Sequence, residues 1–224
     1  MSKKRSKIIK DLVMDNINVL QAMQSLDLML EDINDEEIKK WVNNELNGYE
    51  DNTDIPKYRI VDAMLVGNVQ VGYAIYSNIN IPLSDDEAIK MFTKIEIREP
   101  ISTIMQLAKA EREVENHALS LEANMAVVNY YQKTNGDVIS ARRKLSLYAY
   151  NNILATIKDK LLEIFKILEK NYDKLDELYI DFSDSLKKDV VIKKIESIVY
   201  NDNSINIGDN NQFKDSIVGD ENEN

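Results

Sequence analysis

Cysteine and histidine are almost missing from this chain, which has no cysteine and a single histidine among 224 residues. The lack of cysteine excludes disulfide bonds, thiol nucleophiles and metal sites built on thiolates. One histidine also excludes the metal sites that need two or three imidazole ligands. The composition therefore offers no transition-metal ligand set, and we assign no metal and no cofactor.

Long apolar runs are missing as well. The basic start MSKKRSK leads into IIKDLVMDNINV, where Lys10 and Asp11 interrupt the apolar residues. A secretory signal peptide needs roughly 7–15 consecutive apolar residues, and a membrane-spanning helix needs about 20. We therefore expect a cytoplasmic protein without a membrane span.

The chain does have a large apolar fraction, 44%, and an excess of acid that gives a net charge of -11. This length fits one domain, or one domain with a small appendage, at roughly 100–200 residues per domain. The apolar fraction is sufficient for a globular core. The negative charge repels nucleic acid and anionic lipid, so contact with nucleic acid is disfavoured without being excluded.

Two helices are predicted at the start of the chain. Apolar residues at spacings of three and four from Ile8 to Ile33 predict one amphipathic helix. Asn34, with Glu37 three residues later, has the pattern of a capping box for a second helix. Gly48 is a natural end for that helix.

A small antiparallel sheet is predicted next. Residues 58–81 are rich in Val, Ile and Tyr, and the pair Gly67-Asn68 has the pattern of a tight hairpin turn between two strands. The segment 95–99, IEIRE, predicts a further strand. Because these strands are few and short, the sheet is a minor part of the fold.

Helical patterns dominate the rest of the chain. Ser84 and Glu87 form a capping box for a short helix to about residue 94, and Pro100 suits the first turn of another. Two longer helices are predicted from Glu113 to Lys133 and from about residue 138 past 168, with weaker periodicity around 192–199. We therefore predict an α+β fold that is mainly helical, in one domain over residues 1–200.

The tail, residues 201–224, differs from the rest of the chain in its charge and in its sequence pattern. It has six acidic residues and one lysine, so it contributes -5 of the net charge and leaves -6 to the body. Within it, SINIGDNN (204–211) and DSIVGDEN (215–222) align with a spacing of eleven residues, each as a short strand before a Gly-Asp turn. We predict that this β-prone tail mediates self-association into a homo-oligomer. The residues proposed for that contact are Ile205, Ile207, Gly208, Ile217 and Gly219.

Candidate catalytic groups are sparse. His117 lies four residues after Glu113, as a carboxylate-oriented base would on a helix, but its apolar neighbours favour a core or boundary position. The acidic clusters lie in predicted first turns of helices, where the helix dipole favours them. Arg142, Arg143 and Lys144 are a candidate phosphate contact, although such a cluster is more often a helix turn that faces water. Nucleotide-binding and serine-hydrolase fingerprints are missing from the sequence.

The segment WVNNELNGYEDNTDIPKYR, residues 41–59, is the most distinctive part of the chain. It resembles the signature of the AbiTii family of bacterial abortive-infection proteins. The matching residues are Trp41, Glu45, Leu46, Gly48, Tyr49, Pro56, Tyr58 and Arg59. The resemblance implies a role in defence against bacteriophage, in which the infected cell stops growing or dies before progeny mature. It also implies a partner protein encoded by a neighbouring gene, and it assigns no catalytic residue.

A packing explanation accounts for the same motif. Trp41 and Tyr49 supply apolar area that fixes the helix to the core. Glu45 lies one helical turn from both, on the inward face, where a carboxylate needs a partner. Arg59 is the candidate for a bidentate ion pair with it. We therefore expect these residues to be structural rather than catalytic.

Three functions remain open at this point. The first is an antiviral effector, or effector subunit, with a toxin-like activity that is restrained until infection. The second is a non-enzymatic adaptor or assembly module that works through the tail. The third is a metal-dependent nuclease or another hydrolase whose acidic residues converge only in space. Whether the protein is an enzyme is left undecided.

Overall fold

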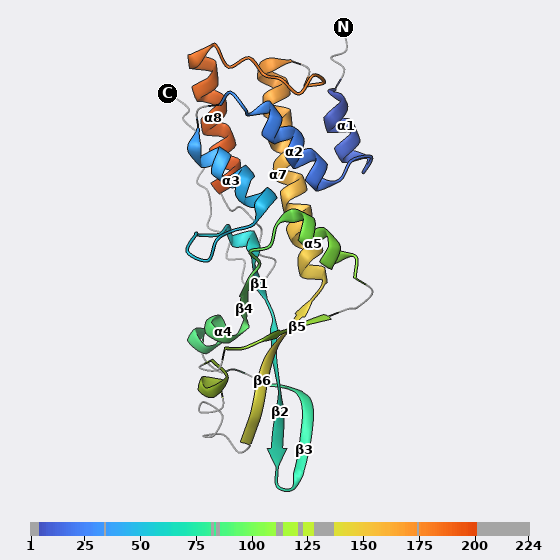
Figure 1. Ribbon diagram of the computed structural model, residues 1–224, viewed down its shortest axis with the longest axis vertical. Helices are drawn as coiled ribbons and strands as arrows, with labels where there is room; N and C mark the ends of the chain where they lie inside the picture. Colours follow the sequence, from blue (N-terminus) through green and yellow to red (C-terminus); the bar gives the residue numbers. More distant parts are fainter. Residues whose placement is uncertain are drawn as a thin grey trace, which may run out of the picture.

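The computed structural model describes residues 5–33, 35–81, 83, 86–110, 114–120, 123–127, 137–173 and 175–200. It is an elongated α+β structure, with a helical bundle at one end and a β-sheet arm at the other (Figure 1). The predicted fold class is therefore confirmed. The tail, with the contact residues predicted in it, lies outside the described residues.

The bundle is assembled around the long helix α7, Tyr148–Tyr172 (Figure 1). The other bundle helices are α1 (Lys7–Val13), α2 (Val19–Met29), α3 (Glu36–Asn47), α5 (Ile101–Ala108) and α8 (Ser185–Tyr200). Nine residues of α7 are buried, and they recur at helical spacing along its length. The main hydrophobic core thus lies between α7 and the helices around it.

The single helix predicted from Ile8 to Ile33 is wrong, because the chain turns between α1 and α2. Asp15 has a positive φ of 57°, which an α-helix does not accommodate. Asn18 then caps α2 by accepting from the Gln21 N–H, while the Gln21 side chain accepts from the Asn18 N–H. Short polar side chains here offer the backbone an alternative to continuing the helix.

Helix α3 ends as predicted, but it begins differently. The Asp35 carboxylate, rather than Asn34, caps it by accepting from the Ile38 N–H at 2.8 Å. Asn34 lies outside the described residues. Gly48 ends the helix with φ 96° and ψ 164°, a conformation that is essentially confined to glycine. The chain can leave α3 at this angle only because residue 48 has no side chain.

The arm is a four-stranded antiparallel sheet in the order β3-β2-β6-β5. Its strands are β2 (Met64–Val71), β3 (Ala74–Asn80), β5 (Val114–Ala118) and β6 (Asp137–Ser146). A separate pair, β1 (Ile60–Asp62) with β4 (Lys94–Glu96), connects the arm to the bundle (Figure 1). Strand β4 lies within the predicted segment 95–99 except for its first residue. Helix α4 (Asp86–Thr93) precedes it and matches the short helix predicted there.

The turn predicted at Gly67-Asn68 is wrong, because both residues lie inside β2. The chain reverses at Gly72, which has φ 61°, and Tyr73. Gly67 has another role: a Cβ atom there would lie 2.5 Å from the Ser140 carbonyl oxygen. Glycine is therefore required at residue 67 for the close approach of β6, beside a β-bulge.

Two predicted helices are also wrong in part, because some of their residues form strands instead. Residues 114–118, within the helix predicted from Glu113 to Lys133, form β5, and residues 137–146 form β6 rather than the start of the long helix. That helix begins at Tyr148. The physical reason is non-local, since β2 pairs with β6 along seven residues, and this pairing overrides local helical preference.

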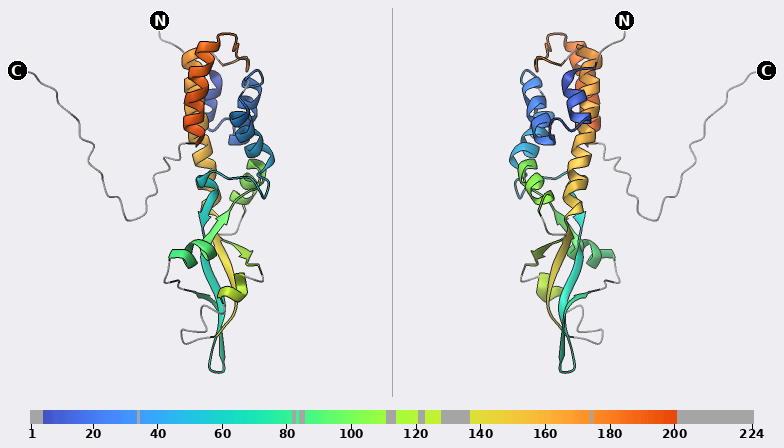
Figure 2. Two further views of the ribbon diagram at one scale, coloured as in Figure 1. Left: turned by 90° about the vertical axis from the view of Figure 1, so that its left-hand side faces the viewer. Right: turned by 90° about the vertical axis from the view of Figure 1, so that its right-hand side faces the viewer.

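A second, smaller core lies against one face of the arm. It contains Leu65 and Val138 from the sheet, together with Phe92 from α4 and Val127 from a short helical turn at 123–127. The arm ends in the hairpin that joins β2 to β3 (Figure 2). Every residue of β3 is exposed.

We predict that Gly48→Ala lowers the free energy of unfolding by about 1–3 kcal/mol, because it places a side chain in a glycine-only conformation. The new Cβ would also lie 3.1 Å from the Arg98 carbonyl oxygen and 3.3 Å from Pro100 Cδ. Chemical denaturation followed by circular dichroism measures this loss. Gly72→Asn is the matched control, since residue 72 has open space around it, and its effect should stay within about 0.5 kcal/mol. Equal losses in the two variants would contradict the prediction.

Candidate functional site

The distinctive segment 41–59 lies where the bundle meets the arm. It comprises the second half of α3, a loop, and the 3-10 helix Lys57–Arg59, which leads directly into β1. Pro56 precedes the 3-10 helix at its N-cap. The segment therefore connects the two parts of the molecule through continuous chain.

Glu45 is the centre of this segment and is completely buried. Its Oε1 atom accepts hydrogen bonds from the hydroxyl groups of Tyr49 and Tyr58, both at 2.6 Å. Its Oε2 atom forms an ion pair with Nη2 of Arg59, which is also completely buried. The expected Glu45–Arg59 pair is thus present, and two tyrosines that were not assigned to it complete the carboxylate's hydrogen bonds.

Arg59 extends the network to the chain that follows β4. Its Nη1 group donates to the carbonyl oxygens of Ile97, at 3.2 Å, and Glu99, at 2.6 Å. The guanidinium carbon lies 5.1 Å from the centre of the Tyr49 ring, within the range of a cation–π contact. One side chain therefore holds three segments together: α3, the 3-10 helix and residues 97–99.

The remaining motif residues support this centre. The indole nitrogen of Trp41 donates to the Tyr58 hydroxyl at 2.9 Å, so Tyr58 both accepts and donates. Leu46 packs half-buried against the main core. The backbone N–H of Tyr49 donates to the Arg98 carbonyl at 2.8 Å, directly after the turn at Gly48.

The burial of this network shifts the pKa values of its members. Burial, and next the negative charge of Glu45, raise the pKa of Tyr49 and of Tyr58 well above the usual value of 10.0. Burial lowers the pKa of Arg59, but attraction to Glu45 and hydrogen bonding to it outweigh that effect and raise it. The network therefore holds one charge pair and two neutral phenols.

Lys160, which belongs to none of the predicted sites, joins the site from α7. Its ammonium group lies 5.4 Å from the centre of the Tyr58 ring and donates to the carbonyl oxygens of Ile198 and Val199. A lysine at the last carbonyls of α8 is favoured by the helix dipole. The sequence contains a pattern that indicates this role: Lys160 falls on the apolar face of the long helix, between Ile157 and Leu161.

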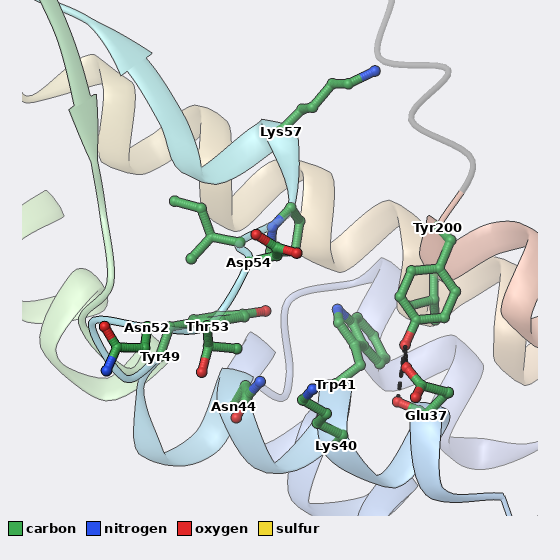
Figure 3. A pocket seen from close by; sticks show the side chains of 13 residues that line it. Glu37, Lys40, Trp41, Asn44, Tyr49, Asn52, Thr53, Asp54, Lys57 and Tyr200 are labelled. Atoms are coloured by element: carbon green, nitrogen blue, oxygen red, sulfur yellow. Dashed lines mark hydrogen bonds between the residues drawn. The ribbon is translucent and has the colours of Figure 1, made fainter.

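A pocket of about 530 Å³ opens beside the network (Figure 3). Helix α3 contributes one wall, the loop after Gly48 another, and the end of α8 the third. Its polar groups include Lys40 and Asn44 on α3 (Figure 3). At the α8 wall, the Tyr200 hydroxyl lies 3.0 Å from the Glu37 carbonyl oxygen and 3.2 Å from Glu37 Oε2. This volume is typical of small-molecule sites.

The pocket and the motif share residues. Trp41, Tyr49 and Pro56 line the pocket while also belonging to the distinctive segment. Trp41 and Tyr49 contribute to the network from their other sides. A molecule that moves Tyr49 by binding in the pocket would therefore also change the hydrogen bond from Tyr49 to Glu45.

The other predicted site residues lie outside this region. Arg142, Arg143 and Lys144 are consecutive on β6, so Arg143 lies on the opposite face of the sheet from Arg142 and Lys144. Arg142 donates to Asn116 at 3.1 Å and also to Asn78, whereas Arg143 donates to the Lys94 carbonyl at 3.0 Å. His117 lies on β5 opposite Arg143. The helical pairing of a base with Glu113 is thus wrong for His117.

The described part of the chain contains no group of three or more His, Asp or Glu side chains placed to hold a metal ion. None of its helices is both long and apolar enough to cross a membrane.

Comparison with known proteins gives one match. The model of the AbiTii family matches residues 6–194, which includes the arm, the whole of the distinctive segment and the bundle as far as the middle of α8. Neither the curated proteins nor the solved structures contain a match to the chain.

We predict that Glu45→Ala lowers the free energy of unfolding by about 3–5 kcal/mol, because it leaves the Arg59 charge buried without its partner. Denaturant titration measures the change. Glu163→Ala, at an exposed position of α7, is the matched control and should stay within about 0.5 kcal/mol. A small effect for Glu45→Ala would mean that the pair adds little to stability.

We predict that Tyr49 and Tyr58 stay protonated in the folded protein at a pH where free tyrosine ionises. Their raised pKa values favour the folded state fully below pH 10.0, and this contribution is lost as the pH rises further, so ionisation accompanies unfolding. Absorbance of tyrosinate against pH, beside circular dichroism, measures both events. In concentrated guanidinium all eleven tyrosines should titrate together. Full titration before any loss of structure would contradict the prediction.

Proposed function

Because the chain belongs to the AbiTii family, we propose that it acts in abortive-infection defence against bacteriophage. The observation that carries this proposal is the family match over residues 6–194, which includes every motif residue from Trp41 to Arg59. In this proposal the protein is an effector, or the subunit of an effector, in the bacterial cytoplasm. Its toxin-like activity is restrained until infection, with the help of a partner protein from a neighbouring gene.

In this proposal the buried network has a structural role. Glu45 and Arg59 are completely buried and each is saturated with partners, so neither presents an atom to a substrate. Such a pair fixes the angle between the bundle and the arm. The motif thus maintains the shape of the protein, and the chemistry of defence belongs elsewhere.

The pocket is the place where we propose that the trigger or the partner makes contact. It is built from the motif on one side and from the end of α8 on the other. Its lining mixes charges of both signs, from Lys40 and Lys57 on one hand and Glu37 and Asp54 on the other. A partner with paired charges and an apolar centre fits such a lining.

Two other functions stay as proposals of lower rank. The adaptor function depends on residues 201–224, which lie outside the described structure, and deleting them tests it. The hydrolase function depends on acidic groups that converge with the phosphate-contact candidates, but Arg142 and Arg143 have separate partners in the sheet. The defence role depends on neither.

We predict that cells expressing the chain with its neighbouring genes give fewer plaques on phage challenge than cells with the empty vector. At high multiplicity of infection the culture should stop growing, because infected cells are sacrificed. Asn44→Arg, which places a long cationic side chain in the pocket, should abolish protection while the free energy of unfolding stays within about 0.5 kcal/mol.

The matched control is Asn43→Arg, which adds the same charge to the same helix at an exposed position outside the pocket lining. It should protect as the wild type does. Equal plaque numbers with and without the wild-type gene would overturn the defence role. Full protection by Asn44→Arg would overturn the pocket's part in it and leave the defence role standing.

A further inference from the structure

The face of the arm sheet that points away from the small core is open and polar. Leu65 and Ala141 belong to that core, so the residues that alternate with them along β2 and β6 point to the other face. The described residues that the strand pairing places on this open face, in the middle of the sheet, are Met64, Val66, Asn68, Asn80, Asn116, Ala118, Ser140, Arg142 and Lys144. Its charged members are thus Arg142 and Lys144, and both are cations.

Strands β2 and β3 bring no carboxylate to this open face. No Asp or Glu occurs from Ala63 to Ser84, in a chain with 39 acidic residues among 224. Helix α4, which begins with Asp86 and Glu87, packs against the small core on the opposite face. The net charge of -11 repels polyanions from most of the molecule, and the open face is a local exception to that repulsion.

A bulge in β3 gives Arg142 one of two neutral partners. Ser77 and Asn78 lie opposite the single residue Asn68 of β2, and Asn78 has a positive φ of 60°. Such bulges re-aim side chains, and here the Asn78 side chain accepts a hydrogen bond from Nη2 of Arg142. Asn116 on β5 accepts from Nε of Arg142 at 3.1 Å. Both acceptors are amides, so the guanidinium is held in place and its charge is not neutralised.

Lys144 lies two residues farther along β6, on the same face. This spacing places its Cα atom about 7 Å from that of Arg142. No acidic side chain of the described structure forms an ion pair with either residue. Arg143 lies between them, but it points to the other face and donates to the Lys94 carbonyl. Two neighbouring cations without counter-charges repel each other, and an anion that contacts both removes this repulsion.

We infer that the open face binds a single-stranded nucleic acid, with Arg142 and Lys144 on successive phosphates. The separation of the two cations is close to that of neighbouring phosphates along an extended strand. The amide side chains around them both donate and accept hydrogen bonds, as the edges of bases do. An open four-stranded sheet is also a surface on which known domains bind unpaired bases. Phosphates and bases therefore both find partners on this face.

An anionic membrane fits the same cations less well. Stable contact with a membrane needs apolar or aromatic side chains that enter the lipid, in addition to cations. Of the residues placed on the open face above, Met64 is the one large apolar side chain that is exposed, whereas Val66 is buried. The exposed neighbours of the cations include Asn80 and Asn116, which suit a polar strand.

Fluorescence anisotropy of a labelled single-stranded DNA of mixed sequence, about 12 nucleotides long, tests this contact with the purified full chain. Because the rest of the chain repels the strand, we expect a Kd on the order of 10⁻⁵ M at about 50 mM salt. Two phosphate contacts give a salt slope of about -1.4, so the affinity should fall about sevenfold between about 50 and 200 mM salt. No rise in anisotropy at about ten times the expected Kd would overturn the inference.

Replacing Lys144 tests the position of the contact. Lys144→Glu should weaken binding at least about tenfold, and Lys144→Gln should reduce the salt slope to about -0.7, because one phosphate contact is lost. The matched control is Lys90→Glu, which makes the same charge reversal at an exposed position of α4, the helix on the opposite face. It should bind as the wild type does. Equal losses for Lys144→Glu and Lys90→Glu would mean that the strand has no defined place on the arm.

A second substitution tests the charge of Arg142 without removing its side chain. Asn116→Asp keeps an acceptor oxygen for Nε of Arg142 and adds a negative charge beside the guanidinium. Binding should therefore fall at least about fivefold, while circular dichroism and the thermal unfolding temperature stay as in the wild type or the latter rises. Wild-type affinity in this variant would show that Arg142 does not contact the strand.

Other occupants of the open face are separated by two further probes. A duplex of the same sequence should bind more weakly than the single strand, because its paired bases do not offer their edges to a sheet. Vesicles rich in phosphatidylserine should bind more weakly as well. Tighter binding of the duplex or of the vesicles would overturn the assignment to single strands. None of these measurements uses phage, so their failure leaves the proposed defence function untouched.

Discussion

The buried ion pair between Glu45 and Arg59 is the interaction on which the rest of the structure depends. Two charges away from water are tolerated only when every remaining donor and acceptor finds a partner. Here two tyrosine hydroxyls and two carbonyl oxygens provide those partners. They come from the turn after α3, from the chain entering β1 and from the chain leaving β4, so satisfying the pair also sets the position of these three segments.

This requirement explains the composition of the distinctive segment. The chain has to leave α3 sharply so that Tyr49 can return its hydroxyl to Glu45, and Gly48 permits that exit. Trp41 is needed because its indole N–H occupies the acceptor side of the Tyr58 hydroxyl, which directs the phenol proton to the carboxylate. The motif is therefore a unit: a change at any of these residues leaves a buried polar group of another unsatisfied.

Local signals in the sequence were sufficient for the ion pair at the centre of this unit, but not for the two tyrosines that complete it. The end of α3, the inward carboxylate and its arginine partner all follow from helical spacing and from the rule that buried charges are paired. The arm was not predictable in the same way. Gly67-Asn68 has the pattern of a turn, but Gly67 serves a close approach to Ser140, which is far along the chain. Residues 137–146 form a strand because they pair with β2, which lies far away in the sequence. Local periodicity carries no information about that pairing.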